Sequence, residues 1–103
     1  MTQPVIGEFT ATGASEWFKP TMRTMAWAHL NISASGTFVA TVKIERSFDG
    51  GTTSFVCSSD SAGTEASFTA PFSVVAEEPS SGVLYRLNCT AYTSGTVTYR
   101  ISQ

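Results

Sequence analysis

Charged residues are scarce in this 103-residue chain, where six basic and eight acidic side chains make up 14% of the sequence. About a quarter is usual for a globular protein. The basic residues are scattered singly, so no basic stripe could follow a phosphate backbone, and we expect no nucleic-acid partner. Serine and threonine, 29 residues together, take the place of the charges, and threonine suits exposed strand positions.

Histidine, cysteine and long apolar runs are equally scarce. The single histidine, His29, excludes a histidine cluster, and Cys57 and Cys89 lack Cys-x-x-Cys spacing, so we expect no metal and no cofactor. No apolar run approaches the roughly 20 residues that cross a bilayer. The N-terminus also lacks the basic and apolar regions of a signal peptide. We therefore expect no membrane partner, synthesis in the cytoplasm and buried thiols, with a Cys57–Cys89 disulfide as the alternative.

The sequence does contain a regular alternation of apolar and polar residues, which is typical of β-strands. Residues 36–57 show it best, because one parity holds Phe38, Ala40, Val42, Ile44 and Phe48. A period of two with one apolar face predicts a half-buried antiparallel strand. Residues 49–51, Asp-Gly-Gly, predict the turn that follows, because glycine tolerates positive φ and aspartate bonds to nearby backbone.

Similar patterns predict further strands at about 6–12, 24–33, 53–58, 66–76, 83–92 and 96–102. A short helix is the alternative for 24–33, and Pro71 makes 66–76 an edge strand or two short strands. The parity of 83–92 predicts inward positions for Val83, Tyr85, Leu87, Cys89 and Ala91.

Seven or eight strands in about 100 residues predict an all-β fold, an antiparallel β-sandwich of immunoglobulin-like or jelly-roll type. We expect residues 1–13 to form an N-terminal arm or edge strand. Residues 14–103 then form a single β-sandwich domain.

Two polar features of residues 46–55 invite a functional interpretation. Residues 47–55 resemble the aspartate-box hairpin of sialidase-type propellers, but propellers repeat this box and the chain has one copy, so we interpret it as a structural turn. Arg46 lies on the apolar parity, where we expect a strand end with the charged head in water; a buried pair with a glutamate is the alternative. Nothing selects a pair of catalytic carboxylates, so we expect no enzyme.

Large apolar residues cluster between positions 17 and 27. Tryptophan, methionine and arginine are enriched at protein interfaces, so this cluster is a candidate interface, with an ordinary core as the alternative. Because Trp17 and Phe18 are adjacent, we expect them to point to opposite faces of a strand. The candidate interface residues are Trp17, Phe18, Met22, Arg23, Met25 and Trp27.

Residues 36–103 resemble small virion proteins of tailed bacteriophages, mainly through Glu-Arg-Ser-Phe-Asp-Gly-Gly-Thr at 45–52 and the segment 82–103. That group includes head decoration (cement) proteins and tail-associated β-domains. The resemblance implies a non-enzymatic decoration subunit in the virion that binds the capsid or other virion proteins, as a homo-oligomer, with a trimer favoured. A tail or head-fibre component and a carbohydrate-binding module with exposed tryptophans are the alternatives.

Overall fold

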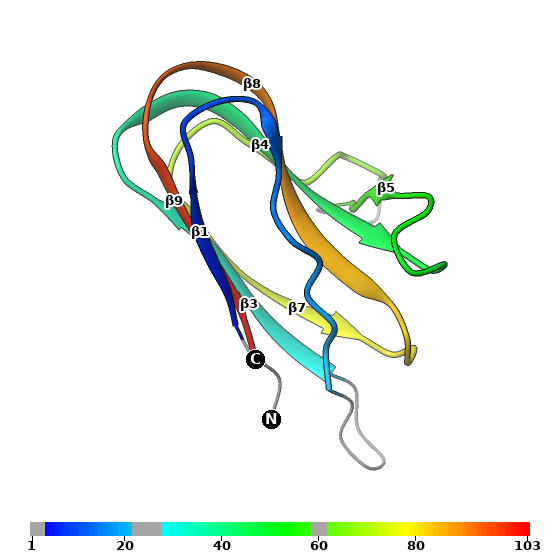
Figure 1. Cartoon of the computed structure of the whole chain (residues 1–103). Coiled ribbons are helices and arrows are strands. Elements are labelled where there is room, and N and C mark those ends of the chain that lie inside the picture. Colours follow the sequence, from blue (N-terminus) through cyan, green and yellow to red (C-terminus); the bar gives the residue numbers. More distant parts are fainter. Residues whose placement is uncertain (1–3, 22–27, 59–61) are drawn as a thin grey trace.

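The computed structural model describes residues 4–21, 28–58 and 62–103. All elements among them are strands, and two antiparallel sheets face each other (Figure 1). The predicted all-β sandwich is therefore confirmed.

The first sheet has the order β1-β9-β3-β7. Its strands are β1 (Val5–Phe9), β9 (Val97–Ser102), β3 (Ala28–Ser35) and β7 (Phe72–Glu78). Hence β1 and β7 are its edge strands.

The second sheet has the order β2-β8-β4-β5, and β6 also pairs with β4. Its strands are β2 (Gly13–Ala14), β8 (Leu84–Gly95), β4 (Phe38–Ser47), β5 (Phe55–Val56) and β6 (Ser67–Phe68). The chain passes directly from β1 in the first sheet to β2 in the second. At the other edges, β7 ends the first sheet, and the short strands β5 and β6 pair with β4 in the second.

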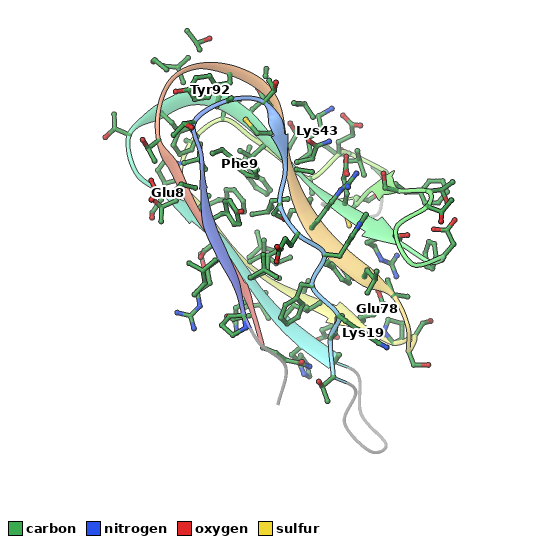
Figure 2. The ribbon with its side chains drawn as sticks, in the orientation of Figure 1. Glu8, Phe9, Lys19, Lys43, Glu78 and Tyr92 are labelled. Carbon is green, nitrogen blue, oxygen red and sulfur yellow. The ribbon has the colours of Figure 1, made fainter. Side chains whose placement is uncertain are left out.

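The core lies between the sheets and follows the predicted alternation most clearly in β3. There Ala28, Leu30, Ile32 and Ala34 are buried and the residues between them face outward. Figure 2 shows the same contrast in β1, where Phe9 lies between the layers and Glu8 outside. The other large buried residues are Phe18, Val42, Ile44, Val83, Tyr85, Leu87, Cys89, Val97 and Ile101.

Two positions depart from the predicted parity. Phe48 is 58% exposed because β4 ends at Ser47 and the chain turns away from the core. Ala91 is exposed because the register between β4 and β8 shifts twice, pairing Val42 with Cys89 but Thr41 with Ala91. An extra residue in one strand reverses the faces of the residues that follow it. Both predicted inward positions are therefore wrong.

Strand boundaries also differ in detail. Pro71 separates β6 from β7, which is the predicted pair of short strands. By contrast, β7 extends through Glu78, two residues beyond its predicted end, and β5 occupies only two of the residues predicted as strand at 53–58.

Candidate functional site

A cleft of about 700 Å³ opens between the sheets on the side of β7. One wall comes from β3 and β7, and the other from β4 and the two short segments that pair with it. Its lining residues are Ile32, Ile44, Arg46, Cys57, Ser58, Ala66, Phe68, Val74, Val75, Ala76, Glu77, Pro79 and Tyr85. Small-molecule sites have this size and this mixture of apolar walls with a few polar groups.

Three polar side chains meet in the interior next to this cleft, each from a different strand. Glu78 ends β7 on the inward parity and is completely buried. Its Oε1 accepts hydrogen bonds from the Arg46 guanidinium and, at 2.7 Å, from the Tyr85 hydroxyl. Its Oε2 accepts from the Ser80 backbone N–H at 3.0 Å. Arg46 and Tyr85 are cross-strand neighbours in β4 and β8.

This arrangement overturns the favoured interpretation of Arg46. The side chain is 31% exposed and forms an ion pair with a fully buried carboxylate, so the alternative of a pair with glutamate is correct. A buried carboxylate needs such a partner, because an unpaired charge in the protein interior is very costly.

Burial raises the pKa of two groups that line the cleft. It raises the pKa of Cys57 to about 12, well above the ordinary thiol value. It also raises the pKa of Tyr85, whose hydroxyl donates to the Glu78 carboxylate. Both groups therefore stay protonated near neutral pH, and the Cys57 thiol is a poor nucleophile. Cys57 and Cys89 are free thiols, and Cys89 is buried as expected, whereas Cys57 is only partly buried.

Two phenylalanines project next to Arg46. Phe48 and Phe55 are 58% and 59% exposed, and their ring centroids are 6.1 Å apart. The guanidinium carbon of Arg46 lies 4.9 Å from the Phe48 centroid and 5.7 Å from the Tyr85 centroid. We call Phe48 and Phe55 the aromatic pair.

A separate polar cluster covers the outer face of the second sheet. Arg86 Nε donates to Glu45 Oε1 at 2.8 Å, and Asn88 Nδ2 donates to Glu45 Oε2 at 3.0 Å. The Trp17 ring lies over the Arg86 guanidinium at 4.3 Å, which is a cation–π distance. Glu45 is buried among these side chains, although its position in β4 faces away from the core.

The two described members of the candidate interface have different environments. Trp17 is half-buried on the outer face of the second sheet, whereas Phe18 is buried in the core. Phe18 is held there by backbone hydrogen bonds to Tyr85 in both directions, at 2.7 and 2.9 Å. The two residues point to opposite faces as predicted, and Phe18 belongs to the core of the single chain. Met22, Arg23, Met25 and Trp27 lie outside the described residues.

The aspartate-box segment is a structural turn. Asp49 Oδ1 accepts from the Thr53 backbone N–H at 2.9 Å and from the Ser47 hydroxyl at 2.8 Å. The Thr53 hydroxyl donates to the other carboxylate oxygen. These bonds, led by the one from the Thr53 hydroxyl, lower the pKa of Asp49 to about 2.

Sequence reasoning missed the cleft, Glu78 and the role of Tyr85. The available signal is Arg46, a charge on an apolar parity, for which a buried pair with a glutamate is the alternative interpretation of the sequence.

Comparisons of the chain with protein-family models, with curated proteins and with solved structures found no match. Residues 4–21, 28–58 and 62–103 include no helix long and apolar enough to span a membrane. The same residues bring together no group of three or more histidine, cysteine or acidic side chains able to hold a metal ion.

Proposed function

We propose that this protein is a non-enzymatic structural subunit of a tailed-bacteriophage virion, specifically a capsid decoration or cement protein. In this proposal it is made in the host cytoplasm, joins the virion as a homo-oligomer, with a trimer favoured, and stabilises the head by burying apolar surface across subunit joints. The observation that carries the proposal is the aromatic pair, two large apolar rings exposed within the segment that resembles virion proteins.

The chemistry of the aromatic pair supports a contact role. Phenylalanine and arginine are enriched at protein interfaces, and Arg46 adjoins the Phe48 ring. Large aromatic rings contribute much of the free energy of association when they are desolvated. Of the ionisable groups nearby, Glu78 is already engaged in an ion pair with Arg46, and the Cys57 thiol stays protonated.

The proposal can be tested on purified particles of the phage that encodes this chain. Mass spectrometry should find the protein in them, and gold-labelled antibodies should bind the head. Label on the tail or fibres would favour the alternative of a tail or fibre component. Absence of the protein from purified particles would overturn the proposal.

The contact surface can be tested by rebinding the protein to heads that lack it. The double substitution Phe48→Ser/Phe55→Ser should weaken rebinding about thirtyfold, the scale of a hot-spot loss of about 2 kcal/mol. The matched control is Ile6→Ser/Val39→Ser, which removes two similarly exposed apolar side chains elsewhere. Equal effects of the two double variants would exclude the aromatic pair as the contact.

A further inference from the structure

We propose that Asp49-Gly50 is a modification site, at which aspartate converts spontaneously to isoaspartate, and that hydrogen bonds from Ser47 and Thr53 to the Asp49 carboxylate slow this conversion in the folded protein. The reaction needs only water and no enzyme, metal or partner. It therefore goes beyond the proposed function, and neither proposal depends on the other.

The reaction takes place between the side chain of Asp49 and the main chain of Gly50. The backbone nitrogen of Gly50 attacks the neutral side-chain carboxyl carbon and forms a C–N bond that closes a succinimide ring. The C–OH bond of the carboxyl breaks, and the hydroxyl leaves as water with the proton of the nitrogen. Water then opens the ring. Opening at the side-chain carbonyl restores aspartate, whereas opening at the main-chain carbonyl gives isoaspartate, so the overall change is an isomerisation.

The position of Asp49-Gly50 suits this attack sterically. Both residues are exposed in the turn after β4. Glycine has no side chain to hinder its nitrogen, and the turn is open here, since a Cβ on Gly50 would meet nothing within 4 Å. The other aspartate of the chain, Asp60, is followed by Ser61, whose side chain hinders the attack.

Three hydrogen bonds oppose the reaction by stabilising the ionised carboxylate of Asp49. Its Oδ1 accepts from the Thr53 backbone N–H and from the Ser47 hydroxyl, and its Oδ2 accepts from the Thr53 hydroxyl. The ionised carboxylate is the unreactive form, because it has no hydroxyl to release. The bonds, led by the one from the Thr53 hydroxyl, lower the pKa of Asp49 to about 2. Above about pH 4, the neutral form is then about tenfold rarer or more than in an ordinary aspartate.

The same turn also restrains the main chain around the reacting bond. Ser47 Oγ accepts from the Gly51 backbone N–H at 2.8 Å, directly after Gly50. The Thr53 backbone N–H, two residues further on, is held at 2.9 Å by Asp49 itself. Ring closure changes the backbone at Asp49 and Gly50, so the turn must open locally before the reaction proceeds.

Isomerisation would alter the turn permanently. Isoaspartate adds one carbon to the main chain and moves the carboxylate to a different carbon, so the bonds to Thr53 could not form again in the same arrangement. Asp49 directly follows Phe48, and the Phe48 and Phe55 rings lie 6.1 Å apart across this turn. The longer main chain would therefore change the placement of the aromatic pair.

The test incubates the purified full chain and its variants at about pH 5, where an ordinary aspartate is still partly neutral. Aspartate and isoaspartate have equal mass, but an aspartate-specific protease cleaves only before aspartate, so mass spectrometry of the digest measures the isomerised fraction at residue 49. We expect Thr53→Val to isomerise about tenfold faster than the wild type, the effect of losing one hydrogen bond to a charged group. Thr53→Ser keeps the hydroxyl and should stay close to the wild type.

Two control variants separate the bonds of the turn from other effects. Thr52→Val makes the same replacement at the preceding threonine, which is also exposed and makes no hydrogen bond to the Asp49 carboxylate, and its rate should equal that of the wild type. Glu78→Gln removes a buried charge away from the turn, so it weakens the fold and leaves the Asp49 bonds in place. Its rate should also be unchanged if local opening, and not global unfolding, limits the reaction.

A further comparison needs no variant. In urea that unfolds the chain, the hydrogen bonds to Asp49 are lost, and the wild type should isomerise about tenfold faster or more than when folded. All variants should then share one rate.

Several outcomes would overturn this proposal. They are no isoaspartate at residue 49 even in the unfolded chain, equal rates for the folded and unfolded wild type, and equal rates for Thr53→Val and the wild type. Acceleration by Thr52→Val or Glu78→Gln as large as that by Thr53→Val would also overturn it, because the hydrogen bonds to Asp49 would then not be what slows the reaction.

Discussion

Glu78 is the central residue of the buried polar network beside the cleft. It is the one carboxylate among the described residues with no exposed surface, and it binds Arg46, Tyr85 and Ser80. Removing one partner of a buried ion pair costs about 3–5 kcal/mol. Glutamine keeps the shape and part of the hydrogen bonding, and Arg46 is partly exposed, so we expect Glu78→Gln to lower the free energy of unfolding by about 2 kcal/mol.

Urea denaturation monitored by tryptophan fluorescence would measure this loss. The neighbouring Glu77→Gln is the control, because Glu77 is exposed and its contact with His29 is a 3.4 Å surface pair. Exposed pairs contribute about 0–1 kcal/mol. If the two substitutions proved equally costly, the buried network would not be the source of the effect.

Asp49 gives the turn after β4 a dependence on pH. The pKa of Asp49 in the folded protein is about 2, below the ordinary value of 3.8. A carboxylate with a lowered pKa stabilises the fold above its ordinary pKa, and this contribution disappears as pH falls through the folded value. We therefore expect Asp49→Asn to be less stable than the wild type at pH 7. The difference should shrink between about pH 4 and pH 2.

Denaturation midpoints of both proteins at pH 7, 4 and 2 would measure that difference. A difference that stays constant over this range would mean that the ionised carboxylate is not what stabilises the turn.

The turn between β4 and β5 also lies against the N-terminal segment, because Gly51 of the turn is next to the Trp17 ring. Gly50 and Gly51 both have positive φ, +75° and +100°. A Cβ on Gly50 would meet nothing within 4 Å, whereas a Cβ on Gly51 would lie 2.5 Å from Trp17 Nε1. Only the second substitution must displace the Trp17 ring from Arg86.

We therefore expect Gly50→Ala to cost about 1 kcal/mol for the backbone conformation alone. Gly51→Ala should cost about 1 kcal/mol more, because the cation–π contact is lost as well. Unfolding in urea gives the free energies, and a shift of the native tryptophan emission should accompany only Gly51→Ala. Equal costs with no spectral change would show that Trp17 does not pack on this turn.

The sequence predicts the fold correctly where the alternation of apolar and polar residues agrees with the pairing of the strands. The parity of β3 is correct because no bulge interrupts its pairing with β7 or β9. The parity of β8 fails at Ala91, since the bulge that moves this residue outward leaves no mark in the alternation of apolar and polar residues. The adjacency of Trp17 and Phe18 is enough to predict that they point to opposite faces, which is correct.

The candidate site was less predictable, because it depends on contacts between distant segments. Arg46, Glu78 and Tyr85 lie on three different strands, and only the strand order and register bring them together. The walls of the cleft also come from distant segments, since β3 and β7 line it together with β4 and the residues around β5 and β6.

At the scale of the whole molecule, the sandwich is asymmetric. The four central strands, β9 and β3 in one sheet and β8 and β4 in the other, each have neighbours on both sides, whereas β7 has one neighbour and borders the cleft. Local opening requires less free energy where fewer contacts must be broken. We therefore expect the amides of β7 to exchange with solvent faster than those of β3, with which it pairs, in hydrogen-exchange NMR of the free protein.

Comparing the exchange rates of the β7 and β3 amides shows whether the free edge of β7 is covered in solution. Both belong to one sheet and pair residue by residue, but among the described residues β7 has no partner strand on its other side and its side chains are less buried. Exchange in β7 as slow as in β3, at every protein concentration, would mean that this edge is already protected within the monomer. Slow exchange only at high concentration would instead mean that copies pair through β7. Fast exchange in β7 at all concentrations would leave its edge available to a partner strand.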